Sequence, residues 1–155
     1  MRYIFSYTLL VLWAALIFYL SSEGSDSSSG RSDAIVQTIQ GLGASWPQDL
    51  LTFLTRKAAH IFAYFVLGIL AFNVVRLYPV GARKAVCMSI GFVLLYAASD
   101  EFHQLFVPGR SGEVRDVLID TTAGTVGVAL AYGVRRVWQR RNAHATSGKN
   151  SKNKV

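Results

Sequence analysis

Three polar blocks interrupt the long apolar runs of this sequence, and their residue types suit acid–base and phosphate chemistry. Within each block the polar positions are three, four or seven apart, so a helix would carry them on one face. The blocks are Lys57, His60 and Tyr64; Asp100, His103 and Gln104; and Asp116 with Asp120. Charged side chains are strongly disfavoured in contact with lipid, so we expect the three faces to meet.

An acid–base interpretation gives these side chains separate roles. Imidazole titrates near neutral pH, so His60 or His103 would act as the general base. A carboxylate would orient that base, and Lys57 with Arg110 would hold a phosphate. The candidate catalytic residues are therefore His60, Asp100, Glu101 and Asp116, and the candidate ligand-binding residues are Lys57, Tyr64, His103, Gln104, Arg110 and Asp120. For Tyr64, a core position with a satisfied hydroxyl is favoured over a role as catalytic acid.

Other interpretations of the polar blocks stay open. Histidines and carboxylates are suitable ligands for zinc or a harder divalent ion. However, Glu101 and His103 stand at i and i+2 and face apart on a helix, which disfavours a metal site. No Gly-x-Ser-x-Gly, His-Glu-x-x-His or P-loop motif is present, so neither a reaction type nor a cofactor follows from the sequence. The alternatives to an enzyme are a non-catalytic binding or envelope-stress protein that recognises a lipid head group, a glycopeptide or a partner protein, and a structural ion network.

The elements that must position these blocks are long and apolar. Of the 155 residues, 52% are hydrophobic and 16% are charged, and the mean hydropathy is +0.32. This composition indicates a small, single-domain membrane protein. The apolar runs predict an all-α, four-helix transmembrane bundle over residues 1–134, with spans at about 4–20, 56–75, 85–104 and 117–134. A cleaved signal peptide is the alternative for the first span.

The segments between the predicted spans are polar or contain helix breakers. Seven serines and two glycines in residues 21–33 predict a water-exposed loop. A short helix that begins after Ser32 would carry its apolar residues on one face and lie on the membrane surface. Pro47 suits the first turn of a helix, and residues 47–55 are expected to form an interfacial lead-in to the second span. Residues 76–84 form a basic turn with proline and glycine as breakers.

Lysines and arginines are distributed unequally between the two sides of the predicted membrane. Eleven of the 16 lie at the N-terminus, in the 76–84 turn and after residue 134, and five lie on the other side. The positive-inside rule therefore predicts that both termini are cytoplasmic and that the polar blocks lie at the outer face. The basic tail, residues 135–155, is expected to be disordered and to attract anionic lipid heads rather than nucleic acid.

Small residues on the fourth predicted span indicate a close helix–helix approach. Ala123, Gly127 and Ala131 are four positions apart, Gly124 adds to the same region, and Gly68 offers a similar notch on the second span. Helices in lipid pack most closely where such residues meet.

These features resemble the VanZ-like family of small bacterial membrane proteins. The matching segments are RKAAHIFAYFVLG at 56–68 and SDEFHQLFVPGRSGEVRDVLIDTTAGTVG at 99–127. The family pattern has Lys, His and Tyr on one helix, then Asp-Glu-x-x-Gln, a Pro-Gly-Arg turn, and Asp-Val-Leu before a small-residue helix. It maps onto Lys57, His60, Tyr64, Asp100, Glu101, Gln104, Arg110 and Asp116.

The resemblance implies a location and a class of partner. A VanZ-like protein would be a multi-pass protein of the bacterial cytoplasmic membrane, and its partner would be a membrane lipid or a lipid-linked envelope molecule. The founding member of the family is associated with low-level resistance to the lipoglycopeptide teicoplanin. The family usually has Asn where this chain has Asp120, so this position departs from the pattern and adds a negative charge. The oligomeric state does not follow from the sequence.

Overall fold

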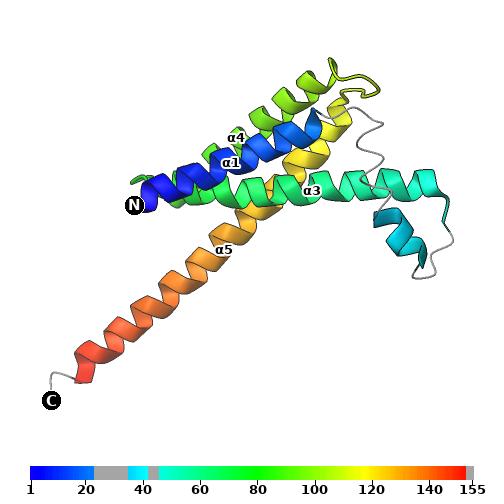
Figure 1. Cartoon of the computed structure of the whole chain (residues 1–155). Helices are drawn as coiled ribbons and strands as arrows, with labels where there is room; N and C mark the ends of the chain where they lie inside the picture. Colours follow the sequence, from blue (N-terminus) through cyan, green and yellow to red (C-terminus); the bar gives the residue numbers. More distant parts are fainter. Residues whose placement is uncertain (23–34, 42–45, 153–155) are drawn as a thin grey trace.

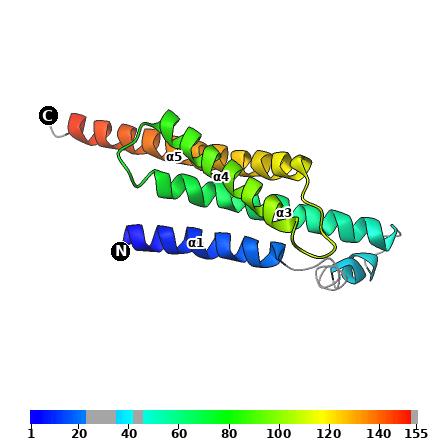
Figure 2. The ribbon, with the colours of Figure 1, turned by 90° about the horizontal axis from the view of Figure 1, so that it is seen from above.

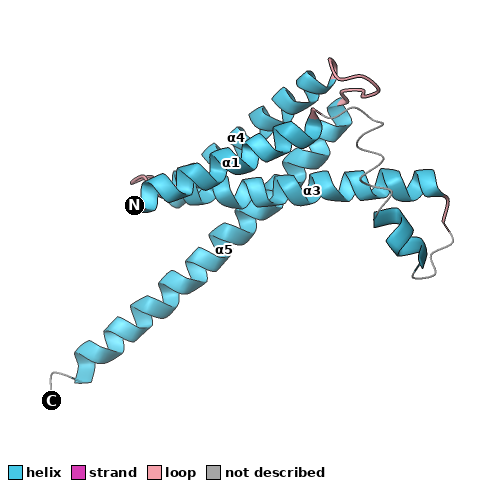
Figure 3. Ribbon diagram, viewed as in Figure 1, coloured by secondary structure: helices cyan, strands magenta, loops and turns pink. Residues whose placement is uncertain are grey.

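The described part of the chain is all-helical. A computed structural model describes residues 1–22, 35–41 and 46–152, with side chains up to residue 142. The long helices are α1 (Arg2–Ser21), α3 (Gln48–Val75), α4 (Ala82–Gln104) and α5 (Val114–Lys152). A short helix spans residues 35–41. Figure 3 shows loops between α3 and α4 and between α4 and α5, and no strand in the ranges described, which confirms the predicted fold class.

All four long helices are apolar enough to cross a membrane, with a mean hydropathy of 1.4 to 2.0 over their most apolar windows. Their outward surfaces carry large apolar side chains: Leu95 is 73% exposed, Leu118 62% and Phe62 60%. A water-soluble protein rarely exposes so continuous an apolar surface. The protein is therefore a multi-pass membrane protein with four candidate spans.

The bundle is built around the crossing of α3 and α5. These two helices share the most extensive contact in the structure, and α4 packs against both of them. Figures 1 and 2 show α1 lying alongside α3, and α5 separating from the other helices towards its C-terminus. The N-terminal part of α3 extends past the other long helices, beside the short helix at residues 35–41.

Glycines permit the close approach of α3 and α5. A side-chain carbon on Gly68 would meet the backbone carbonyl of Gly124, and one on Gly127 would meet the carbonyl of Phe65. Both neighbours are backbone atoms, which cannot rotate out of the way. The predicted small-residue contact is thus confirmed, and it sets the rotation of α3 against α5 that the polar side chains depend on.

The middle of the α1 helix is attached by two side-chain hydrogen bonds to backbone carbonyls. Trp13 Nε1 donates to the Ala63 carbonyl on α3 at 2.9 Å, and the Tyr96 hydroxyl on α4 donates to the Ala14 carbonyl at 2.6 Å. The rest of α1 is mostly exposed, with 11% of its apolar window buried. Interhelical hydrogen bonds of this kind stabilise contacts in lipid, where the hydrophobic effect contributes little between helices.

Two predicted boundaries differ from the structure. The lead-in at 47–55 and the second span form one helix, α3, because no proline after Pro47 interrupts it. α5 continues to Lys152, where a disordered tail was expected from residue 135. Residues 135–147 contain neither glycine nor proline, so nothing in that segment stops a helix that has already begun. Most of the serine-rich segment 21–33 lies outside the described residues, as do residues 153–155.

Candidate functional site

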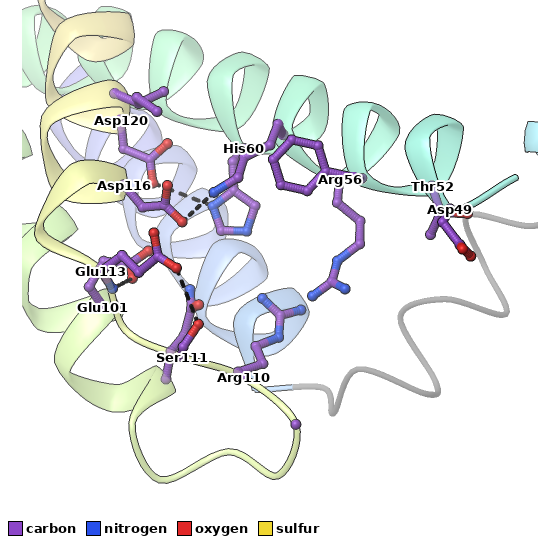
Figure 4. Close-up of a pocket in the computed structure, with 15 residues that line it drawn as sticks. Asp49, Thr52, Arg56, His60, Glu101, Arg110, Ser111, Glu113, Asp116 and Asp120 are labelled. Carbon is purple, nitrogen blue, oxygen red and sulfur yellow. Dashed lines mark hydrogen bonds and ion pairs between the residues drawn. The ribbon is translucent and has the colours of Figure 1, made fainter. Parts of the chain in front are cut away.

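A pocket of about 330 Å³ lies where the α4–α5 turn faces the N-terminal half of α3 (Figure 4). Seven of the ten candidate site residues line it. They are Lys57, His60, Glu101, Gln104, Arg110, Asp116 and Asp120. The expectation that polar faces of three helices meet is confirmed for the five of these that belong to the polar blocks, namely Lys57, His60, Gln104, Asp116 and Asp120.

The other three candidates lie outside the pocket. The Tyr64 hydroxyl donates to Oδ2 of Asp100 at 3.1 Å, and both side chains are buried in the bundle core, one helical turn deeper than His60. This confirms Tyr64 as a core residue with a satisfied hydroxyl. It also corrects the expected position of Asp100, which faces α3 rather than the pocket. His103 lies towards α1, where its ring centroid is 4.5 Å from that of Phe18.

His60 and Asp120 form the floor of the pocket. Nδ1 of His60 on α3 lies 3.4 Å from Oδ2 of Asp120 on α5. The Asp120 side chain is 2% exposed, while that of His60 is 26% exposed, so the imidazole has access to the pocket. Within the described residues, no side chain pairs with its Nε2. A carboxylate at Nδ1 orients an imidazole and leaves Nε2 available for proton transfer.

Lys57 and Asp116 form an ion pair between α3 and α5. Their side chains are 31% and 18% exposed, so the pair is half-buried at the pocket wall. The Lys57 chain also lies over the Phe53 ring, with Nζ 5.6 Å from the ring centroid. The ammonium expected to hold a phosphate is therefore already paired with a carboxylate.

Glu101 and Gln104 connect α4 to the neighbouring segments. Glu101 Oε2 accepts a hydrogen bond from the Glu113 backbone N–H at 2.9 Å, which fixes the loop just before α5. Gln104 Nε2 donates to the Ser21 hydroxyl at 2.9 Å and thereby attaches the end of α1. Both side chains are buried. These two residues line the pocket, but their side chains make structural contacts.

Two arginines stand at the mouth of the pocket. Figure 4 shows the guanidinium groups of Arg56, from α3, and Arg110, from the α4–α5 turn, directed towards one another. Gly109 has a φ of 73°, a conformation that favours glycine, and this turn directs the Arg110 side chain back across the pocket. Arg110 Nη2 donates to the Leu20 carbonyl at 3.3 Å. Arg56 forms no ion pair within the part of the chain that the structure describes.

Sequence reasoning missed several residues of this pocket, and Arg56 is the most consequential. It lies in the segment that carries the family resemblance, but it is not one of the ten candidate site residues. A signal was present, because Thr52, Arg56 and His60 are four positions apart and share one face of α3. Glu113 and Ser111, from the loop before α5, also line the pocket, but the sequence carries no periodic signal for loop residues.

The pocket combines both charge signs around a small volume. Carboxylates outnumber cations along its walls, yet two of the cations, Arg56 and Arg110, lie together at the open side. Among the residues described, no three histidines, cysteines or carboxylates are grouped closely enough to hold a metal ion. The pocket therefore has an imidazole–carboxylate pair, His60 and Asp120, at its floor and two guanidinium groups, those of Arg56 and Arg110, at its mouth.

Comparison with protein families identifies the chain. A family model described as VanZ/LLP1 matches residues 6–137. The chain belongs to the VanZ/LLP1 family. The match covers α3, α4, most of α1, the first part of α5 and every candidate site residue, and it confirms the resemblance that the polar blocks carry. No curated protein and no solved structure matches the chain significantly.

Proposed function

We propose that this VanZ/LLP1 protein recognises, and chemically alters, an anionic lipid or lipid-linked envelope molecule at the outer face of the bacterial cytoplasmic membrane. The observation that carries the proposal is the position of Arg56 and Arg110 above the His60–Asp120 pair in one pocket. The outer location rests on the excess of lysine and arginine at the opposite end of the helices.

The arginine pair favours a phosphate-bearing head group. A guanidinium presents a planar fork of N–H donors that fits two oxygens of a phosphate or carboxylate at once. The pocket volume of about 330 Å³ is suited to a head group rather than to a whole lipid. Acyl or polyprenyl chains of such a molecule would remain in the bilayer beside the apolar outer surfaces of α3 and α5.

His60 supplies the proton-transfer group in this proposal. Its Nε2 would take a proton from a hydroxyl or a water molecule that attacks the phosphorus of the bound ester, and Asp120 would stabilise the imidazolium that forms. The new P–O bond replaces the bond to the ester oxygen, and the imidazolium returns the proton to that oxygen as the alcohol leaves. Asp120 stands where the family usually has Asn, so this chain has a carboxylate at the position that faces the imidazole.

A non-catalytic binding function is the second candidate, and a specific observation favours it. The other candidate catalytic carboxylates already have partners: Asp100 accepts from Tyr64, Glu101 from the Glu113 backbone, and Asp116 pairs with Lys57. Of the predicted acid–base groups, only the His60–Asp120 pair then remains for proton transfer in the pocket. In that case the pocket would recognise an envelope precursor or a glycopeptide and confer teicoplanin resistance by binding.

The test combines variants with lipid and envelope-precursor profiling of cells. Arg110→Lys keeps the charge but loses the planar fork, and it should weaken ligand-dependent activity by about tenfold or more, since a hydrogen bond to a charged group contributes about 1.5–3 kcal/mol. Arg115→Lys is the matched control, because Arg115 is exposed and does not line the pocket. His60→Gln keeps hydrogen bonding but cannot exchange a proton near neutral pH.

The outcomes separate the two candidates. Loss of a substrate–product conversion in both pocket variants, at normal protein level in the membrane, supports catalysis. Loss of teicoplanin resistance in Arg110→Lys alone, with an unchanged lipid profile, supports binding. If both variants behave like Arg115→Lys, the pocket is a structural ion network and the proposal fails.

A further inference from the structure

A second pocket lies at the opposite end of the bundle, close to the N-terminus of α1. Its volume is about 320 Å³, and it is formed by α1, by the C-terminal end of α3 with the two residues that follow it, and by α5. Each of these three segments contributes one arginine: Arg2, Arg76 and Arg135. We propose that this pocket binds the phosphate group of an anionic phospholipid.

The charge of the pocket requires a partner from outside the protein. No aspartate or glutamate lines it, and the acids that the structure describes lie in or beside the first pocket, at the other end of the helices. Three neighbouring guanidinium groups repel one another, and the repulsion is stronger near lipid than in water. An anion placed among them would remove that repulsion.

The hydrogen bonding of the arginines also favours an anionic ligand. Arg76 Nη1 donates to the Val80 carbonyl at 2.5 Å. Arg135 differs, because its Nε is buried and has no hydrogen-bond partner among the residues described. A buried donor without a partner is unfavourable, and phosphate oxygens are strong acceptors for it.

The apolar wall of the pocket distinguishes a lipid from a soluble phosphate. Leu9, Leu70 and Phe5 line the same space as the arginines, so a ligand with both a charged head and a hydrocarbon chain fits better than a free anion. Tyrosines surround this end of the bundle: the Tyr3 hydroxyl donates to the Leu77 carbonyl at 3.1 Å, and the Tyr7 and Tyr78 hydroxyls are hydrogen-bonded to each other.

Tyrosine is enriched at the membrane–water interface, which is the depth of lipid head groups. Basic pockets between transmembrane helices on the cytoplasmic side commonly bind such head groups. A phosphate held here would connect Arg2 of α1 with Arg135 of α5. The bound lipid would therefore brace α1, the least buried of the long helices, against the rest of the bundle.

The test measures lipid-dependent stability and lipid retention of the purified full chain in neutral detergent. Short-chain phosphatidylglycerol should raise the melting temperature and remain bound in native mass spectra. Phosphatidylcholine of the same chain length, and inorganic phosphate at the same concentration, should do neither. Each arginine removed should lower the affinity for phosphatidylglycerol about fivefold.

The variants are Arg2→Gln and Arg135→Gln, with Arg140→Gln as the matched control. Arg140 is an exposed arginine of α5 that lies outside the pocket. Arg2 is also exposed, so Arg2→Gln should fold even if Arg135→Gln does not. The expected result is weaker phosphatidylglycerol binding in the two pocket variants and unchanged binding in Arg140→Gln.

Three results would overturn the proposal. An equal loss in Arg140→Gln would mean a general attraction between the basic helix and anionic lipid. Equal stabilisation by phosphatidylcholine, which carries a phosphate but no net charge, would mean that the pocket does not select an anionic lipid. Equal stabilisation by inorganic phosphate would mean a site for a free anion and not for a lipid.

Discussion

The two ends of the bundle hold charge in opposite ways. At the α4–α5 turn, Lys57 pairs with Asp116 and His60 with Asp120, so most charges there have a partner within the protein. At the other end, the charged residues that line the pocket around Arg76 and Arg135 are all arginines. Internal pairs fix side-chain positions whatever the surroundings, whereas a cluster of one sign depends on what the membrane supplies. The first arrangement suits recognition and chemistry, and the second suits anchoring.

The glycine contact between α3 and α5 supports both ends, so disrupting it should have the largest effect. Gly127→Leu places a side chain against the Phe65 carbonyl and should lower the free energy of unfolding by about 3 kcal/mol, the upper end of overpacking costs. Gly133→Leu is the control, because nothing lies within 4 Å of a side chain added there. Thermal unfolding in detergent measures both variants. Equal losses would mean that the crossing is not held by this contact.

Tyr64→Phe should lower stability without loss of function at the end of the bundle where the charges are paired. It removes the hydrogen bond to buried Asp100, whose Oδ1 already has no partner in the described structure, and should cost about 1–3 kcal/mol of stability. Because Tyr64 lies outside the pocket, the resistance or lipid phenotype should persist at normal protein level. A lost phenotype in a stable Tyr64→Phe protein would place this residue in the functional site.

Breaking the Lys57–Asp116 pair should have a smaller effect than losing a buried partner. Both side chains are partly exposed, so we expect Lys57→Met to cost about 1 kcal/mol. The loss should be similar in neutral and anionic detergent mixtures. Arg2→Gln is the comparison at the other end, because Arg2 is exposed and lines the arginine pocket, and its effect should appear only when anionic lipid is present. If the stability lost in Lys57→Met depended on anionic lipid, the two ends of the bundle would not differ in their dependence on lipid.

Labelling of introduced cysteines perturbs the protein least and assigns each end to a side of the membrane. Ser111→Cys and Arg140→Cys are exposed positions at the two ends, made in a chain whose Cys87 is replaced by serine. An impermeant thiol reagent should label Ser111→Cys in intact cells and Arg140→Cys only after permeabilisation, because the excess of lysine and arginine predicts cytoplasmic termini. The reverse pattern would invert the proposed topology.

Much of the architecture follows from local features of the sequence. Apolar runs of bilayer length determine the four long helices, and the spacing within Lys57, His60 and Tyr64 gives each side chain its direction around α3. The helix ends were less well predicted, because neither the lead-in at 47–55 nor the basic segment after residue 134 contains a residue that stops a helix.

The sequence by itself determined which polar side chains could share a helix face, because helical periodicity is a local property. Only the tertiary structure decided which of them share a pocket, since that depends on how each helix is rotated against its neighbours. The glycine crossing of α3 and α5 sets one rotation and turns His60 towards Asp120. The packing of α4 sets another, which directs Asp100 to Tyr64 and His103 to Phe18, away from the pocket. The α4–α5 turn then brings Arg110 opposite Arg56, a meeting of residues far apart in the chain that no sequence spacing encodes.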